Sequence, residues 1–133
     1  MKLSIVDNKI QLDNLFFLYY NKIVNLLFRL IWSDVLEVTF KNSKIKKICT
    51  EPKIASKKYS EPMADIIAQR IVELRASETI EELLKDKIGR CHSLKGDRKG
   101  QYAMDLIHPQ RLVFTVHKKQ IQIAKIIEIV DYH

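Results

Sequence analysis

Residues 91–131 read CHSLKGDRKGQYAMDLIHPQRLVFTVHKKQIQIAKIIEIVD, and this stretch decides the fold class. Four runs of apolar and β-branched residues predict four strands. The strands are expected over about 91–94, 101–106, 111–117 and 121–131. A segment with two glycines separates the first two runs, Pro109 separates the next two, and Lys118–Lys119 precedes the last. Strands that follow one another at such short intervals pair antiparallel.

The residues before this stretch predict one further strand and then helices. Residues 36–40 alternate apolar and polar side chains, as a half-buried strand does. A short helix is expected over 44–49, a longer one with Pro62 in its first turn, and a third, short one around residues 80–84. Their N-caps are predicted to be Asn42 or Ser43, Ser60 and Ser77, respectively. This order predicts an α+β domain over 36–133, with helices on one face of a mainly antiparallel sheet.

Residues 1–35 are expected to form a separate N-terminal extension. Asn21, Lys22 and other polar residues interrupt its apolar runs, so they leave no stretch long enough for a membrane span. Asp7 and Asp13 stand where a signal peptide carries basic residues. Two interpretations stay open. The segment is a helix that packs on the domain, or it is not native and translation begins near Val35.

The composition favours a folded domain with a polyanionic partner. The chain has 133 residues, of which 47% are hydrophobic and 29% charged, so one packed domain is expected. Lys and Arg number 23 against 16 Asp and Glu, which makes the net charge +7. Residues 36–58 concentrate this excess, with seven Lys and two Glu. An excess of this sign favours RNA, DNA or an acidic protein surface as partner.

Several chemistries find no support in the residue pattern. The two cysteines, Cys49 and Cys91, are too few for a disulfide scaffold, so a reducing, cytoplasmic setting is expected. A cysteine inside a strand is usually part of the core, which argues against Cys91 as a nucleophile. No phosphate-binding glycine loop leads into a helix, so no nucleotide cofactor is expected. His92, His108 and His117 lack the spacing of a zinc site, and no metal is expected either.

Basic and imidazole side chains on or beside the predicted strands suit phosphodiester cleavage in RNA. That reaction needs a base for the ribose 2′-hydroxyl, an acid for the departing 5′-oxygen and cations for the charge of the phosphorane. Histidine can act as acid or base near neutral pH, and Lys and Arg stabilise negative charge. The candidates are His92, Lys95, Arg98, Lys99, Tyr102, Arg111, Asp131, Tyr132 and His133. The alternative for residues 95–100 is an ordinary solvated turn.

Three segments carry a resemblance to a known toxin family. They are HSLKGDRKGQY at 92–102, PQRLVF at 109–114 and EIVDYH at 128–133. Together they resemble the HigB branch of the RelE/ParE toxin superfamily, over about residues 36–133. The resemblance implies a small β-α-α-β-β-β domain that belongs to a toxin–antitoxin module and cleaves mRNA bound in the ribosomal A site. It also implies inhibition by HigA, a helix-turn-helix antitoxin.

The resemblance assigns roles to the candidate residues. The catalytic set it implies is His92, Asp131, Tyr132 and His133, with His133 favoured as an acid or base. The residues expected to bind RNA phosphate are Lys95, Arg98, Lys99 and Arg111. Tyr102 occupies an aromatic position and is expected to support the site. Gln110 stands where the family often has Tyr or Trp, which weakens a base-stacking role there.

The sequence therefore predicts an mRNA interferase, a ribosome-dependent endoribonuclease toxin that inhibits translation. Two alternatives stay open. One is a ParE-like toxin that poisons DNA gyrase by binding and does not need His92 and His133. The other is an inactive nucleic-acid-binding homologue. The expected partners are a HigA-like antitoxin, the ribosome with mRNA in its A site, and operator DNA reached only through the antitoxin complex; no membrane partner is expected.

Overall fold

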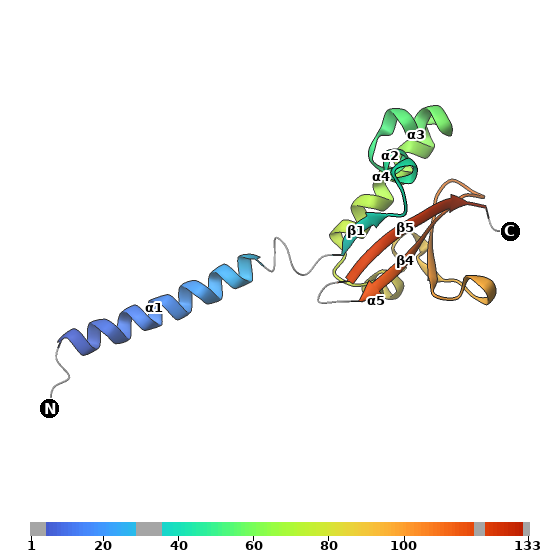
Figure 1. Ribbon diagram of the computed structural model, residues 1–133. Helices are drawn as coiled ribbons and strands as arrows, with labels where there is room; N and C mark the ends of the chain where they lie inside the picture. The colour runs from blue at the N-terminus through green and yellow to red at the C-terminus, as the bar shows by residue number, and fades with distance from the viewer. Residues whose placement is uncertain (1–4, 29–35, 119–121, 132–133) are drawn as a thin grey trace. The chain divides into compact units, whose positions relative to one another are not determined.

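The chain divides into two compact units, Met1–Asp34 and Val35–His133. The structure is a computed structural model that describes residues 5–28, 36–118 and 122–131. In the first unit the described residues form one helix, α1 (Ile5–Phe28), which confirms the predicted helical extension (Figure 1). The apolar side chains from Leu15 to Tyr20 are all 57–71% exposed. None of the helices in the described ranges is both long enough and apolar enough to cross a membrane.

The second unit contains the predicted sheet. Its strands are β1 (Glu37–Phe40), β2 (His92–Ser93), β3 (Gln101–Asp105), β4 (Arg111–Lys118) and β5 (Gln122–Val130). Their order across the sheet is β1-β5-β4-β3-β2. β1 pairs parallel with β5, whereas β5, β4, β3 and β2 pair antiparallel in succession. The mainly antiparallel sheet predicted from residues 91–131 is thereby confirmed.

Four helices lie between β1 and β2 in the chain. They are α2 (Ser43–Thr50), α3 (Pro52–Lys58), α4 (Glu61–Ala76) and α5 (Ile80–Lys85). The side chain of Asn42 accepts a hydrogen bond from the backbone of α2, so Asn42 is the cap of the two residues considered, and Ser60 caps α4 as predicted. α3 was not predicted from the sequence. It buries only Ala55, so it has no apolar stripe for a periodicity argument to detect.

The predicted cap at Ser77 is wrong, because Thr79 caps α5 instead. Thr79 Oγ1 accepts a hydrogen bond from the backbone N–H of Glu82 at 3.2 Å. Ser77 ends α4: its hydroxyl donates to the carbonyl oxygen of Glu73 at 2.8 Å, and it is 3% exposed. Its own carbonyl oxygen accepts from the N–H of Leu36 at 2.8 Å. The hydroxyl of Ser77 is thus used within α4, and Thr79, directly before the first residue of α5, takes the N-cap position.

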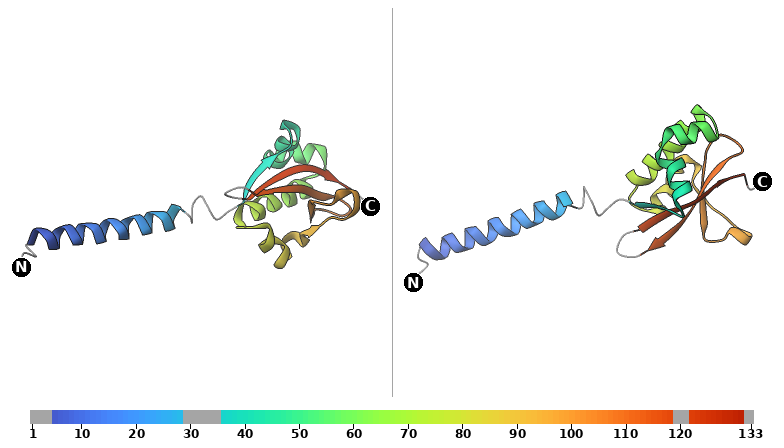
Figure 2. Two further views of the ribbon diagram at one scale, coloured as in Figure 1. Left: turned by 60° about the horizontal axis from the view of Figure 1, so that its bottom comes forward. Right: turned by 45° about the horizontal axis from the view of Figure 1, so that its top comes forward.

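The main core lies between the helices of the second unit and one face of the sheet, and the right-hand view of Figure 2 shows α2, α3 and α4 together on one side. Met104, Leu112 and Phe114 of the sheet are fully buried there, in one cluster with Ile67 and Leu74 of α4. Side chains alternate between the two faces of a strand, so Ala103, next to Met104, and Val113, between Leu112 and Phe114, point to the opposite face.

The second face of the sheet carries a smaller cluster. Leu94, which follows β2, is buried with Ala103 and Val113, and Ile127 and Val130 pack against them. The segment between β2 and β3 therefore lies against the sheet face that the helices leave uncovered. Two short 3₁₀ helices flank β2: η2 (Ile88–Arg90) precedes it, and η3 (Gly96–Arg98) lies within the β2–β3 segment.

Candidate functional site

Strand pairing brings residues that are distant in the chain to one end of the sheet. Asp105 at the end of β3 pairs with Arg111 at the start of β4, and Arg111 pairs in turn with Val130 at the end of β5. His92 of β2 pairs with Ala103, two residues before Asp105. The C-terminal segment therefore begins beside the Asp105–Arg111 pair.

A hollow of about 700 Å³ opens at this end of the sheet. Its lining residues are Leu84, Lys87, Arg90, Cys91, His92, Ser93, Asp105 and Arg111. Lys87, Arg90 and Arg111 are cationic and Asp105 is anionic, so the lining carries an excess of positive charge even with His92 neutral. Such a charge attracts an anionic ligand. Of the site residues predicted from the sequence, the hollow unites His92 and Arg111.

The imidazole ring of His92 is oriented by the backbone. The side chain is exposed on β2, and Nδ1 lies 2.8 Å from the carbonyl oxygen of Arg90. A carbonyl oxygen only accepts, so Nδ1 is the nitrogen that donates in this hydrogen bond. In the neutral ring Nε2 is then the nitrogen that can take up a proton. The geometry suits a residue that exchanges protons with a ligand in the hollow.

Arg111 is a largely buried cation held from several sides. Its Nε lies 2.9 Å from Oδ1 of Asp105, as an ion pair without the alignment of a hydrogen bond. Its Nη1 donates to the carbonyl oxygens of Pro109 and Gln110, at 3.3 and 3.1 Å. On the other side of the carboxylate, Nε of Arg90 lies 3.4 Å from Oδ2 of Asp105. The carboxylate of Asp105 thus forms ion pairs with two guanidinium groups, and these contacts hold Arg111 in place at the wall of the hollow.

The other predicted RNA-binding residues lie in the β2–β3 segment and do not line the hollow. Lys95 and Lys99 are exposed. Arg98 donates to Oε1 of Gln101 at 3.0 Å and to the carboxylate of Glu128 on β5. The contact with Glu128 connects the β2–β3 segment to β5, which is separated from β3 by β4 in the sheet. Arg98 therefore positions the segment, a role that its place in a basic motif did not reveal.

The predicted catalytic residues at the C-terminus are only partly described. β5 ends at Val130, one residue earlier than predicted, and Asp131 follows it as an exposed residue. Tyr132 and His133 lie outside the described residues. Since Val130 pairs with Arg111, Asp131 follows directly after the strand that reaches the hollow's end of the sheet.

Tyr102 and the cysteines belong to the core. The ring of Tyr102 stacks on Phe114, with centroids 5.7 Å apart, and it packs against the main cluster. Burial raises the pKa of Cys49 and of Cys91 to about 12. A thiol with so high a pKa carries almost no thiolate near pH 7, which agrees with the core role expected for Cys91.

Three charged residues of the hollow were not among the predicted site residues: Lys87, Arg90 and Asp105. The available signal for the first two was a pair of cations close to a glycine just before His92, in the order Lys87-Ile88-Gly89-Arg90. Asp105 had no comparable signal, because a carboxylate at the end of an apolar strand is usually a solvated surface group. Within the described ranges, no group of three or more His, Cys, Asp or Glu residues is placed to hold a metal ion.

Two solved structures have folds similar to that of this chain. One is a YoeB/ParE toxin from Agrobacterium tumefaciens, with 15% identity and a TM-score of 0.49, and the match covers 74% of this chain and 100% of that one. The other is a chain of a YoeB–YefM complex from Staphylococcus aureus, with 22% identity and a TM-score of 0.48, covering 74% and 97%. No protein-family model and no curated protein matches the sequence. At these identities the likeness to the two structures is one of fold.

Proposed function

We propose that this chain is the toxin of a toxin–antitoxin module and cleaves mRNA on the ribosome, through attack of a ribose 2′-hydroxyl on the adjacent phosphate. The observation that carries the proposal is the positively charged hollow, in which His92 and Arg111 lie together beside the end of β5. Its second support is the resemblance of residues 92–102 and 128–133 to the HigB toxins.

The proposed reaction divides the proton transfers between two histidines. One takes the proton of the 2′-hydroxyl as its oxygen attacks phosphorus, and the other gives a proton to the 5′-oxygen as the P–O5′ bond breaks. His92 has its Nδ1 on a carbonyl oxygen and exchanges its proton at Nε2. His133 is the second candidate, and Tyr132 completes the set. Asp131 is proposed to orient the imidazole of His133, since a carboxylate that accepts from one ring nitrogen fixes the tautomer. The products are a 2′,3′-cyclic phosphate, or the 3′-phosphate derived from it, and a 5′-hydroxyl.

Cations are proposed to stabilise the charge of the phosphorane and to hold the RNA strand. Arg111, fixed by Asp105, contributes positive charge at the wall of the hollow. Lys95 and Lys99 are exposed on the β2–β3 segment and are proposed to contact backbone phosphates. Arg98 supports them by holding that segment to β5.

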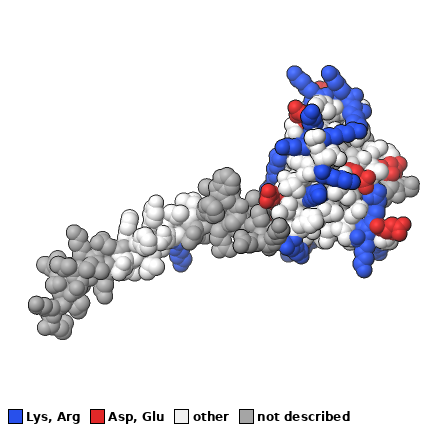
Figure 3. Space-filling view, in the orientation of Figure 1, with Lys and Arg blue, Asp and Glu red and all other residues white. Residues whose placement is uncertain are grey.

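The proposed partners are the ribosome and a HigA-like helix-turn-helix antitoxin, with operator DNA bound through the antitoxin complex in the cytoplasm. Figure 3 shows Lys and Arg side chains gathered over α2 and α3, at the top of the second unit. The exposed lysines of these helices are Lys44, Lys46, Lys47, Lys53, Lys57 and Lys58. A surface of this charge suits the phosphate backbone of ribosomal RNA.

Cleavage of mRNA on programmed ribosomes tests the proposal. Replacement of a positioned acid or base lowers the rate by about 10²–10⁴-fold, so His92→Ala should be nearly inactive. His117→Ala is the matched control, because His117 is also an exposed strand histidine but pairs with Ile123 at the other end of β4. Wild type and His117→Ala should cut the mRNA only when ribosomes are present. Intact mRNA together with trapped gyrase–DNA complexes would select gyrase poisoning instead.

A further inference from the structure

A turn with two cations forms the wall of the hollow beside His92. Lys87 and Arg90 stand on either side of Ile88 and Gly89, and both line the hollow. Lys87 is exposed and forms no ion pair with any residue in the described part of the chain. The side chain of Arg90 is 85% exposed. Both positive charges are therefore accessible to a ligand in the hollow.

Asp105 is shared between Arg90 and Arg111, so it neutralises Arg90 only in part. Its carboxylate lies closer to Arg111, at 2.9 Å, than to Arg90, at 3.4 Å. The side chain of Arg111 is only 13% exposed, so its positive charge would be buried without a counter-ion if Asp105 turned away. The carboxylate is therefore expected to stay with Arg111. An exposed ion pair such as the one with Arg90 contributes little, and its guanidinium can turn toward a phosphate at small cost.

The turn is fixed in position by its packing. Lys87, Gly89 and Arg90 have φ values of 51°, 58° and 54°, in the left-handed region. A Cβ at Gly89 would lie 2.8 Å from Nε of Arg70, so the backbone there packs directly against this side chain. Nε of Arg70 in turn donates to the carbonyl oxygen of Asp105 at 2.7 Å. The two cations are thus carried by a backbone that α4 and β3 hold in place, a form of preorganisation that favours ligand binding.

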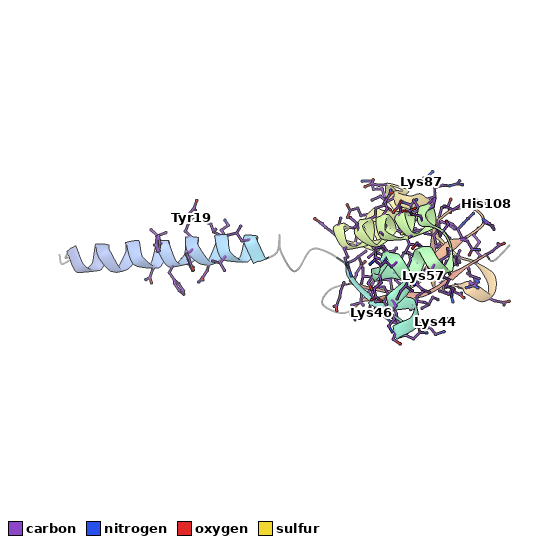
Figure 4. The ribbon with its side chains drawn as sticks, turned by 90° about the horizontal axis from the view of Figure 1, so that it is seen from above. Tyr19, Lys44, Lys46, Lys57, Lys87 and His108 are labelled. Atoms are coloured by element: carbon purple, nitrogen blue, oxygen red, sulfur yellow. The ribbon has the colours of Figure 1, made fainter. Side chains whose placement is uncertain are left out.

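We infer that Lys87 and Arg90 form a phosphate subsite, which holds a backbone phosphate of single-stranded RNA next to the linkage at which His92 acts. The inference rests on the proposed function for the identity of the ligand as RNA. The subsite is distinct from the lysines of α2 and α3: Figure 4 shows Lys87 on the opposite side of the second unit from Lys44 and Lys46. Neither of its residues belongs to the sequence motif at 92–102.

Binding of a labelled single-stranded 2′-O-methyl RNA, followed by fluorescence anisotropy over a range of salt concentrations, tests the subsite. This RNA lacks the 2′-hydroxyl nucleophile, so binding is measured without cleavage. Each lost charge-assisted contact should weaken binding about tenfold. The double variant Lys87→Gln/Arg90→Gln should therefore bind about a hundredfold more weakly. Its slope of log K against log salt should be shallower by about 1.4, since each phosphate contact on a single strand contributes about 0.7.

Two further variants make the result specific. Lys85→Gln removes an exposed lysine two residues before the subsite, outside the hollow, and should bind like wild type. Lys87→Arg/Arg90→Lys keeps both charges and should retain most of the affinity. Circular dichroism of all the proteins verifies the fold.

The outcomes separate the subsite from the proposed activity. If wild type cleaves mRNA on ribosomes but the Gln double variant binds RNA like Lys85→Gln, the subsite is wrong and the proposed function stands. If the double variant loses affinity while wild type cleaves no RNA, the subsite stands and the proposed endonuclease activity fails. If Lys85→Gln lost as much RNA affinity as the double variant, the weaker binding would be an effect of general surface charge, and the subsite would be wrong.

Discussion

Asp105 holds the guanidinium groups of Arg90 and Arg111, and its replacement should lower the stability of the protein. In Asp105→Asn the largely buried charge of Arg111 would be left with carbonyl oxygens alone. A buried charged donor that loses its partner costs about 1–3 kcal/mol, so the midpoint of urea unfolding should fall. Asp97→Asn, at an exposed position in the β2–β3 segment, is the control and should shift the unfolding free energy by less than about 0.5 kcal/mol. Equal midpoints for the two variants would show that Asp105 carries no structural ion pair.

His133 is proposed as the second proton-transfer group, and a single substitution tests this role. His133→Ala should lower the cleavage rate on programmed ribosomes by about 10²–10⁴-fold. Its urea unfolding midpoint, measured alongside, verifies that the variant is folded. An undiminished rate would remove His133 from the reaction and leave His92 to be paired with another group.

Gly89 and Gly96 offer a controlled comparison of two turns, η2 and the β2–β3 segment. Both have a positive φ, 58° and 63°, so an alanine at either position strains the backbone by about 1 kcal/mol. At Gly96 nothing lies within 4 Å of the added Cβ, whereas at Gly89 it would meet Arg70 and Met104 at 2.8 Å. Gly89→Ala should therefore destabilise the protein by about 1–3 kcal/mol more than Gly96→Ala, by displacing Arg70 from its hydrogen bond to β3. Similar unfolding midpoints would mean that η2 is not packed against α4.

The two cysteines report on opening of the whole second unit. Cys49 of α2 and Cys91 beside β2 are both buried in the main core cluster, and burial raises the pKa of each to about 12. Thiol reagents attack the thiolate, so at pH 8 the native protein should react very slowly, and both thiols should react together as unfolding exposes them. Ellman's reagent with increasing urea measures this. Rapid reaction of one thiol in the absence of urea would contradict a closed core around it.

The second unit has a core of its own, which allows the N-terminal segment to be removed. A protein that begins at Val35 should unfold cooperatively and retain cleavage on ribosomes, because the described hollow is built from residues 84–111. Insolubility of this shortened protein, with recovery on restoring residues 15–32, would show instead that the segment covers part of the folded domain.

The strand runs of residues 91–131 by themselves determined the mainly antiparallel sheet, and Asn42 and Ser60 determined where two helices begin. Both signals are local: the alternation of side chains and the capping of free backbone N–H groups act within a few residues. Thr79 rather than Ser77 caps α5, because which of two nearby hydroxyl residues serves as cap depends on what the rest of the fold buries. α3 buries a single residue, so its sequence shows no helical periodicity of apolar side chains from which it could be predicted.

Which basic residues line the hollow was decided by the tertiary structure alone. In the sequence, Arg98 and Arg111 are equivalent to Lys95 as cations of a motif. In the structure Glu128 binds Arg98 and Asp105 binds Arg111, while Lys87 and Arg90, outside the motif, line the hollow with exposed side chains. Glu128 lies 30 residues from Arg98 in the chain, and only the pairing of β3, β4 and β5 brings them together. The charge of a side chain is a property of the sequence, but whether that charge is already neutralised depends on long-range contacts that no local pattern encodes.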